Sequence, residues 1–139
     1  MFNSIVPGGN VLVQGASRGI GLEFVRQCLA EPRIGQVIAT CRTPDTAGGL
    51  TKLAARAGTR LTVLPLDATD ETSIIAAAAG VRRVVPRLHL IVNCAGVLHD
   101  AAHGLRPEKR LQDIRPEALA RAFAVNAIGP LLVARHFEP

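Results

Sequence analysis

The chain has 139 residues, of which 48% are apolar and 3% aromatic, and it contains four Phe but no Trp or Tyr. This length allows one modest core, and the composition suits a sheet covered by closely packed helices. The formal net charge is +5, but the longest basic run is the pair Arg82-Arg83, and no Tyr or Trp is present to stack on bases. The charge pattern therefore argues against a nucleic-acid partner.

The sequence shows no targeting or membrane segment. No apolar run approaches the roughly 18 residues of a membrane span, and residues 1–7 lack the basic flank and apolar stretch of a signal peptide. We therefore expect a cytoplasmic protein with no membrane partner. Cys28, Cys41 and Cys94 are far apart, and each lies in an apolar segment, which predicts buried free thiols without a disulfide or a zinc site.

The first elements are a short strand, a glycine-rich turn and a helix. The apolar run 11–13 is too short for a helix and predicts a buried strand. Gly15, Gly19 and Gly21 follow, and apolar residues then recur at helical spacing to about Ala30. Such a turn points the free N–H groups and the positive end of the helix dipole at the space above the strand. This arrangement favours a bound anion.

The spacing G-x-x-x-G-x-G differs from the G-x-G-x-x-G dinucleotide fingerprint, because Phe24 stands where the third glycine would be. It resembles the loop of the short-chain dehydrogenase/reductase family. The resemblance implies a Rossmann-type α/β fold and a dinucleotide held at this turn. The turn residues that we assign to cofactor binding are Gly15, Ser17, Arg18, Gly19, Ile20 and Gly21.

A second strand is predicted over Gln36–Arg42. In dinucleotide folds an acid near this position binds the ribose 2′-hydroxyl, whereas an arginine accommodates a 2′-phosphate. This strand ends in Arg42, and no carboxylate follows before Asp45. Arg18 faces the same pocket, and two guanidinium groups favour a dianionic phosphate. We therefore expect NADP(H), with NAD(H) as the alternative cofactor and two solvated arginines as the alternative interpretation.

The next predicted elements are a turn and helix over Pro44–Ala57, a third strand over Arg60–Leu66 and a helix from Glu71 to about Val85. The segment between the last two reads D-A-T-D and resembles the D-x-[TS]-[DN] segment of the family. The resemblance implies that Asp67 contacts the adenine ring. Asp70 is expected to serve only as the cap of the following helix.

A fourth strand over Leu88–Val92 precedes Asn93-Cys94-Ala95-Gly96, which resembles the family's N-N-A-G element. The resemblance implies that Asn93 braces the sheet, while Ala95 and Gly96 let the backbone pass beside the cofactor ribose. Cys94 replaces the second Asn of that element, a departure expected to weaken a structural hydrogen bond. An ordinary turn at the end of a strand is the alternative.

Residues 97–115 form a long polar connection. His99, Asp100 and His103 lie within it, but their spacing is not one that fixes a metal, so we expect solvated side chains and no metal site. The segments Gly96–His99 and Leu105–Lys109 resemble the carbonyl-reductase-type branch related to bacterial C-factor.

A final helix is expected to begin at Pro116, with Leu119, Phe123 and Asn126 on its inner face. Pro130 has no N–H, so the Asn126 carbonyl loses its usual helical donor. This predicts a kinked helix with a free carbonyl. The resemblance gives Asn126 the catalytic role of holding a water in the proton relay, and a packing kink is the alternative.

Together these elements predict one domain, residues 1–139, with a doubly wound parallel sheet in the order 3-2-1-4 and helices on both faces. We expect it to be a short-chain dehydrogenase/reductase domain truncated before its fifth strand, and either an incomplete product or a shortened isoform. The open apolar edge at Leu88–Val92 predicts aggregation or pairing, including as a homo-oligomer.

The resemblance implies an NADP(H)-dependent oxidoreductase that transfers hydride between nicotinamide and a small carbonyl or alcohol substrate. The family uses a Ser, a Tyr and a Lys for this chemistry, and the chain has no Tyr. We therefore expect it to be inactive alone. The alternative is a non-catalytic nucleotide-binding or interaction isoform. A methyltransferase-type nucleotide fold is disfavoured by the turn spacing and by the residues 93–96.

Overall fold

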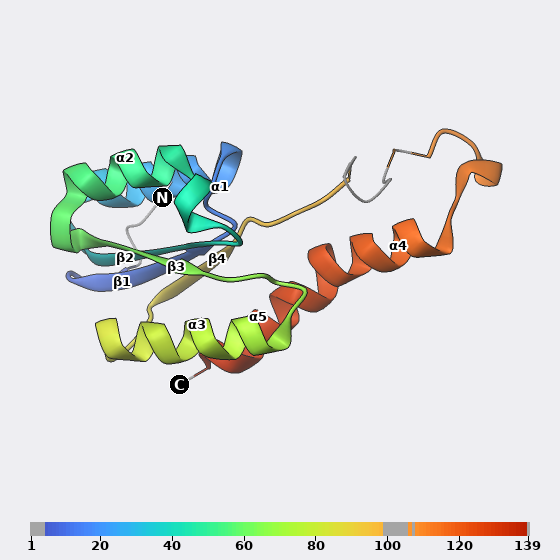
Figure 1. Ribbon diagram of the computed structural model, residues 1–139. Coiled ribbons are helices and arrows are strands. Elements are labelled where there is room, and N and C mark those ends of the chain that lie inside the picture. The colour runs from blue at the N-terminus through green and yellow to red at the C-terminus, as the bar shows by residue number, and fades with distance from the viewer. Residues whose placement is uncertain (1–4, 99–105, 107, 139) are drawn as a thin grey trace.

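The computed structural model describes residues 5–98, 106 and 108–138. Four parallel strands form one sheet in the order β3-β2-β1-β4, which confirms the predicted order (Figure 1). The strands are β1 (Gly9–Gln14), β2 (Ile34–Cys41), β3 (Leu61–Pro65) and β4 (Leu90–Asn93). The helices are α1 (Gly19–Ala30), α2 (Gly48–Ala57), α3 (Glu71–Val84), α4 (Pro116–Phe123) and α5 (Gly129–Phe137).

The two central strands, β1 and β2, are largely buried on both faces, which explains their nearly continuous apolar sequences. Alternate side chains of β1 enter two separate clusters: Val11 and Val13 pack on the side of α1 and α2, and Leu12 packs on the side of α3 and α5. Figure 1 shows the same two helical layers above and below the sheet. The predicted Rossmann-type arrangement is confirmed.

The strand boundaries differ from the prediction by one or two residues. β2 starts at Ile34 rather than Gln36, and β4 starts at Leu90 rather than Leu88. Asn10 explains the late start of β4, because its side-chain amide donates to the Arg87 carbonyl and its backbone N–H donates to His89 Nδ1. Beside these side-chain contacts, the His89 N–H donates a backbone bond to the Asn10 carbonyl at 2.8 Å. Asp70 caps α3 by accepting from the Thr72 N–H at 2.9 Å, as predicted.

The last helical region is one continuous run interrupted by a π-helical turn at Ala124–Ile128. This irregularity falls in the segment where the sequence predicted a kink. In a regular α-helix the Pro130 ring would clash with the Asn126 carbonyl, and the wider turn relieves that clash. In this turn the Gly129 N–H bonds to the Ala124 carbonyl, five residues back.

The prediction that Leu119 and Phe123 face inward is wrong, because they are 42% and 62% exposed. The reason is the position of α4, which extends away from the sheet, whereas α5 lies beside α3 (Figure 1).

The expectation of no membrane-length segment also needs correction. Residues Pro116–Phe137 form a 22-residue helical run, and an 18-residue window within it has a mean hydropathy of 1.4, so the run is long and apolar enough to span a membrane by length and composition alone. Such a single run is weak evidence for a span.

Polar contacts and one close approach fix α5 on the rest of the fold. Glu71, at the start of α3, accepts from His136 Nε2 at 2.7 Å and pairs with Arg135 Nη1 at 3.5 Å. Gly129 is buried at the start of α5, and a side chain there would approach the Ala68 carbonyl oxygen to 2.8 Å. Glycine therefore lets α5 pack directly against the loop that follows β3.

All three cysteines are free thiols in the described part of the chain, as predicted. Cys28 and Cys41 are buried, but Cys94 is only partly buried. Burial raises the pKa of the Cys28 thiol to about 11. A thiol with so high a pKa is protonated and unreactive at neutral pH.

The close approach at Gly129 yields a stability prediction. We expect Gly129→Ala to lower the free energy of unfolding by about 1–3 kcal/mol, because the new methyl group overpacks the contact with Ala68. Gly48→Ala is the matched control: it also lies at the first position of a helix, and a side chain there meets no described atom within 4 Å. The control should raise stability by up to about 1 kcal/mol. Urea unfolding measures both, and equal effects would contradict the packing argument.

Candidate functional site

A cleft of about 580 Å³ lies at the carboxyl ends of the strands. The turn after β1, the ends of β2, β3 and β4, and one face of α4 and the π-helical turn line it. It brings together all the residues predicted to bind the cofactor except Asn93, namely Gly15, Ser17, Arg18, Gly19, Ile20, Gly21, Arg42, Asp67, Ala95 and Gly96. Among the described residues, Asn93 is exposed at the end of β4, outside this lining.

The glycine turn is anchored to β2. The N–H groups of Gly15 and Ala16 both donate to the Thr40 carbonyl, at 3.0 and 2.9 Å. Gly15 has φ of +79°, which favours glycine, and a side chain there would collide with the backbone of Ala95. The turn after β1 therefore packs directly on the loop after β4.

The amino terminus of α1 opens into the cleft. Arg18 is the N-cap residue and makes no side-chain cap bond with any described residue, and the first turn holds no acid. A side chain at Gly19 would meet no atom of the described chain within 4 Å, so the space beside the helix start is open. Gly21 approaches the Gly15 carbonyl closely, which seats α1 on the turn. The result is an uncapped helix terminus with room for an anion.

Two arginines line the same cleft as this terminus. Arg18 precedes α1 and Arg42 follows β2, and both side chains are exposed. Because their charges add to the positive end of the helix dipole, this part of the cleft is strongly cationic. A ligand group with more than one negative charge suits it best.

Asp67 is the carboxylate of the cleft. Thr69 donates two hydrogen bonds to the same Asp67 oxygen, Oδ1, from its N–H at 2.8 Å and from its hydroxyl at 2.7 Å. Burial raises the pKa of Asp67, but these two bonds and the charges of Arg42 and Arg121 outweigh it, so the net pKa is below the ordinary aspartate range. Asp67 is thus ionised at neutral pH and can act only as an acceptor.

Gln14 is a site residue that the sequence analysis missed. It is 3% exposed at the end of β1, and it joins this strand to the loop after β4. Its backbone carbonyl accepts from the Cys94 N–H at 2.8 Å, and its side-chain Oε1 accepts from the Ala95 N–H at 3.2 Å. The Gln14 side chain therefore braces the segment in which Cys94 departs from the family pattern. The sequence signal that could have identified Gln14 is a polar residue at the end of an apolar strand, directly before Gly15.

Asn126 lies beside the cleft and holds the loop after β4. Its side-chain Oδ1 accepts from the Val97 N–H, and its Nδ2 donates to the Val97 carbonyl, both at 2.8 Å. Val97 lines the cleft. The side chain of Asn126 thus fixes the position of Val97, and the predicted role of its backbone carbonyl stays a prediction.

Arg121 and Val125 also line the cleft and were missed. They lie four residues apart, on one face of α4 and the π-helical turn. Arg121 Nη1 donates to the Thr69 hydroxyl at 3.4 Å, which connects α4 to the loop after β3. The i, i+4 pair was visible in the sequence, but the same spacing placed Leu119 and Phe123 on the predicted inner face.

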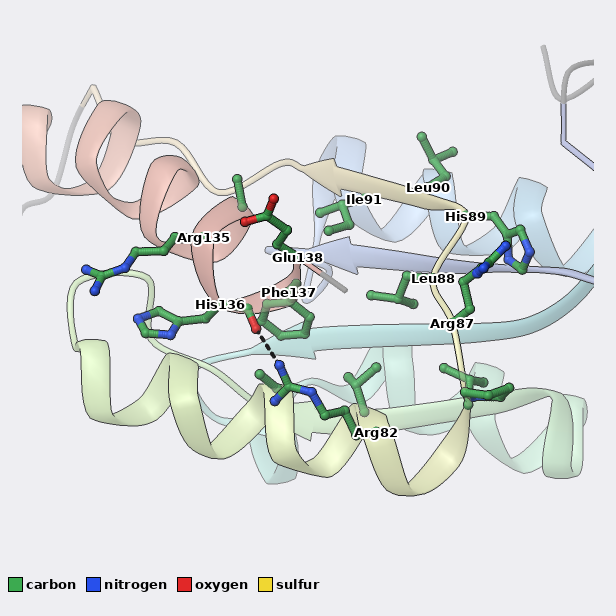
Figure 2. A pocket seen from close by; sticks show the side chains of 15 residues that line it. Arg82, Arg87, Leu88, His89, Leu90, Ile91, Arg135, His136, Phe137 and Glu138 are labelled. Carbon is green, nitrogen blue, oxygen red and sulfur yellow. Dashed lines mark hydrogen bonds between the residues drawn. The ribbon is translucent and has the colours of Figure 1, made fainter.

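A second hollow, a groove of about 750 Å³, lies beside the edge strand β4 (Figure 2). Apolar residues of β4 and the preceding segment, together with Phe137, line it, and Arg82, Arg87 and Arg135 stand around it. The groove is larger than the cleft but contains none of the glycine turn. The uncapped helix start and the two arginines therefore assign the candidate site to the smaller cleft.

No group of three or more potential metal ligands occurs among the described residues. His99, Asp100 and His103, which the sequence analysis weighed as ligands, lie outside them. So do Leu105 and Pro107, which belong to the segments that carried the carbonyl-reductase resemblance.

The chain is similar in sequence to known short-chain dehydrogenases and reductases. The profile of the short chain dehydrogenase family matches residues 9–139. The chain is 34% identical over 136 residues to the short chain dehydrogenase tazN of Aspergillus terreus, covering 95% of this chain and 27% of that protein. It is 32% identical over 130 residues to the L-xylulose reductase of Caenorhabditis elegans, covering 90% of this chain and 45% of the reductase.

Solved structures agree with these matches. The crystal structure of NADPH-bound carbonyl reductase from chicken fatty liver superimposes with a TM-score of 0.82 at 34% identity, covering 97% of this chain and 52% of that one. The chain thus spans about half the length of the carbonyl reductase and less of the two curated relatives.

The Asn126 contact yields a second prediction. We expect Asn126→Ala to lower the free energy of unfolding by about 1 kcal/mol, because two partly solvated hydrogen bonds to Val97 are lost. Hydrogen exchange at the Val97 amide should accelerate. Gln112→Ala, which removes an exposed amide from the turn Leu111–Asp113, is the matched control and should change neither quantity. If hydrogen exchange at the Val97 amide is unchanged in Asn126→Ala, the two hydrogen bonds between Asn126 and Val97 do not form.

The Asp67 environment yields a third prediction. Because the folded-state pKa of Asp67 lies below its unfolded value of about 3.9, its ionised form stabilises the fold above that pH, and this contribution disappears as pH falls through the folded pKa. Thr69→Val removes one hydrogen bond to the carboxylate and should raise the Asp67 pKa. Titration of the Asp67 carboxyl carbon by NMR measures the change. Thr59→Val, at an exposed position, should leave the Asp67 pKa where it is.

Proposed function

The chain belongs to the short-chain dehydrogenase family, and on that premise we propose that its cleft binds NADP(H) for an oxidoreductase that transfers hydride between nicotinamide and a small carbonyl or alcohol substrate. One observation carries this proposal: the uncapped start of α1 opens into a cleft that Arg18 and Arg42 also line. Helix N–H groups and guanidinium groups together bind phosphates.

The arginines favour NADP(H) over NAD(H). A ribose 2′-phosphate carries two negative charges, and a guanidinium can bind it through paired, charge-assisted hydrogen bonds. In NAD-binding sites an acid accepts the 2′-hydroxyl instead, but Arg42 is the residue that follows β2 here. The NADPH-bound state of the similar chicken carbonyl reductase supports the same choice.

We assign the residues as follows. The turn from Gly15 to Gly21 holds the pyrophosphate, and Arg18 and Arg42 hold the 2′-phosphate. Asp67 accepts from the adenine, and Ala95 and Gly96 lie against the ribose. Asn93 braces the sheet from outside the cleft, and Asn126 holds a water through its backbone carbonyl.

NADP(H) would supply or accept the hydride, while the residues of this chain bind and orient it. The Tyr that donates the proton in the family has no counterpart among the 139 residues, which include no Tyr. We therefore propose that this polypeptide alone binds the cofactor without turning over a substrate. That composition also favours the second candidate, a non-catalytic nucleotide-binding chain.

The three free thiols fit a reducing compartment, and we assign the protein to the cytoplasm.

The cofactor assignment gives the fourth prediction. Arg42→Gln should weaken NADPH binding roughly 10- to 100-fold, the value of a lost hydrogen bond to a charged group, and should leave NADH binding nearly unchanged. Titration of the nicotinamide fluorescence measures both. Arg56→Gln, an exposed arginine of α2 outside the cleft, is the matched control for net charge.

Two outcomes would contradict the proposal. If the wild-type chain binds no NADPH, the cleft does not serve this cofactor. If the 139-residue chain oxidises NADPH in the presence of a small aldehyde or ketone, the proton comes from a group other than Tyr. Size-exclusion chromatography of the same sample reports whether the open edge at β4 causes association.

A further inference from the structure

We propose that Arg121 is a positioning residue that acts through Thr69 to orient the Asp67 carboxylate toward the adenine amino group, and thereby sets the preference for adenine over a base without that group. This inference rests on the proposed function. Arg121 belongs to none of the motifs by which the sequence resembles the family.

A continuous chain of contacts runs from α4 to Asp67. Arg121 Nη1 donates to the Thr69 hydroxyl at 3.4 Å, and this hydroxyl donates to Asp67 Oδ1 at 2.7 Å. The Thr69 N–H donates to the same Oδ1 at 2.8 Å. Because both bonds end on one oxygen, they fix the rotation of the carboxylate and leave Oδ2 as its second acceptor. All three residues line the cleft.

The Arg121 contact also holds the Thr69 hydroxyl in one orientation. A hydroxyl that accepts from a guanidinium directs its own hydrogen elsewhere, and here that hydrogen goes to Asp67. The positive charge of Arg121 further favours the ionised carboxylate, as does that of Arg42. Loss of Arg121 would let the Thr69 hydroxyl rotate and would weaken its bond to Asp67.

The π-helical turn explains how Arg121 reaches this position. Residues five apart in an α-helix point about 140° away from each other. The π-helical turn Ala124–Ile128 adds the equivalent of one extra residue, so Arg121 and Asn126 project as residues four apart would. One helical segment therefore contacts Thr69, in the loop after β3, and Val97, in the loop after β4.

The chemistry of the carboxylate identifies the part of the ligand that it meets. An ionised Asp67 repels phosphates, so it must face an uncharged donor. β3 lies two strands from β1, roughly 10 Å from the glycine turn that holds the pyrophosphate. On this side of the turn, past Arg42, the remaining donor-rich group of NADP(H) is the adenine with its amino group. A base with a carbonyl oxygen there would be repelled.

The test compares NADPH with its reduced hypoxanthine analogue, in which a carbonyl oxygen replaces the amino group. Both are titrated onto the 139-residue chain by nicotinamide fluorescence, and the readout is the ratio of the two dissociation constants. The wild-type chain should prefer NADPH by roughly tenfold or more, the effect of one charged hydrogen bond. Arg121→Met keeps the unbranched stem in the helix and should reduce this preference at least about threefold, since the carboxylate is no longer held.

Further variants separate positioning from charge. Thr69→Val should reduce the preference as Arg121→Met does, and the double variant should do no more, because the two residues act as one unit. Arg115→Met removes an exposed arginine from the start of α4 and should leave the preference intact. Asp67→Asn should invert it, since a side-chain amide can donate to the hypoxanthine oxygen. Circular dichroism and urea unfolding establish that each variant is folded.

The outcomes are distinct. A wild-type chain that binds no NADPH overturns the proposed function together with this inference. A wild-type chain that binds both cofactors equally overturns the inference alone, as does an Arg121→Met variant that weakens both by the same factor. If Arg121→Met does not fold, Thr69→Val decides: an unchanged preference in that variant overturns the inference.

Discussion

The site depends on the close approach of three backbone segments at the carboxyl edge of β1. Gly21 brings α1 against Gly15, and Gly15 in turn packs on the backbone of Ala95. The Thr40 carbonyl holds the turn by accepting from the first two of its N–H groups. The N–H groups at the start of α1 have no partner within the helix, and this anchored turn places them at the cleft. A side chain at Gly15 or Gly21 would push these segments apart. The glycine turn and the start of α1 would then no longer line the cleft together.

The α4–α5 segment gives the cleft its second wall. Arg121 donates a hydrogen bond to the loop after β3, and Asn126 accepts one from the loop after β4. Gly129 lets α5 pack on Ala68. A regular helix could not direct the first two side chains to the same edge of the sheet. The π-helical turn therefore has a positional consequence beyond accommodating Pro130. The helix places both loops at once, and the two sides of the cleft are linked through it.

The fold was predictable because the strands are short apolar runs bounded by Gly, Pro or polar residues. The glycine spacing predicted the turn that lines the cleft, because backbone geometry dictates those residues locally, whereas Asp67 in the D-A-T-D segment was assigned through the family resemblance. Gln14 and Arg121 were missed because their partners, Ala95 and Thr69, lie 81 and 52 residues away in sequence. Leu119 and Phe123 were misplaced because periodicity defines an apolar face but not what covers it. The exposure of α4 follows from tertiary placement, which the pattern along one helix does not contain.

The charges of the cleft make sense only with a ligand bound. Arg18, Arg42 and Arg121 and an uncapped helix start lie around one carboxylate, Asp67, so positive charge is in excess. Without an anion these groups repel one another, and the free N–H groups of α1 depend on water. A phosphate-bearing ligand relieves both penalties, and by linkage its binding must stabilise the folded chain. The same residues that weaken the empty cleft are thus the ones on which the proposed binding of a highly charged nucleotide depends.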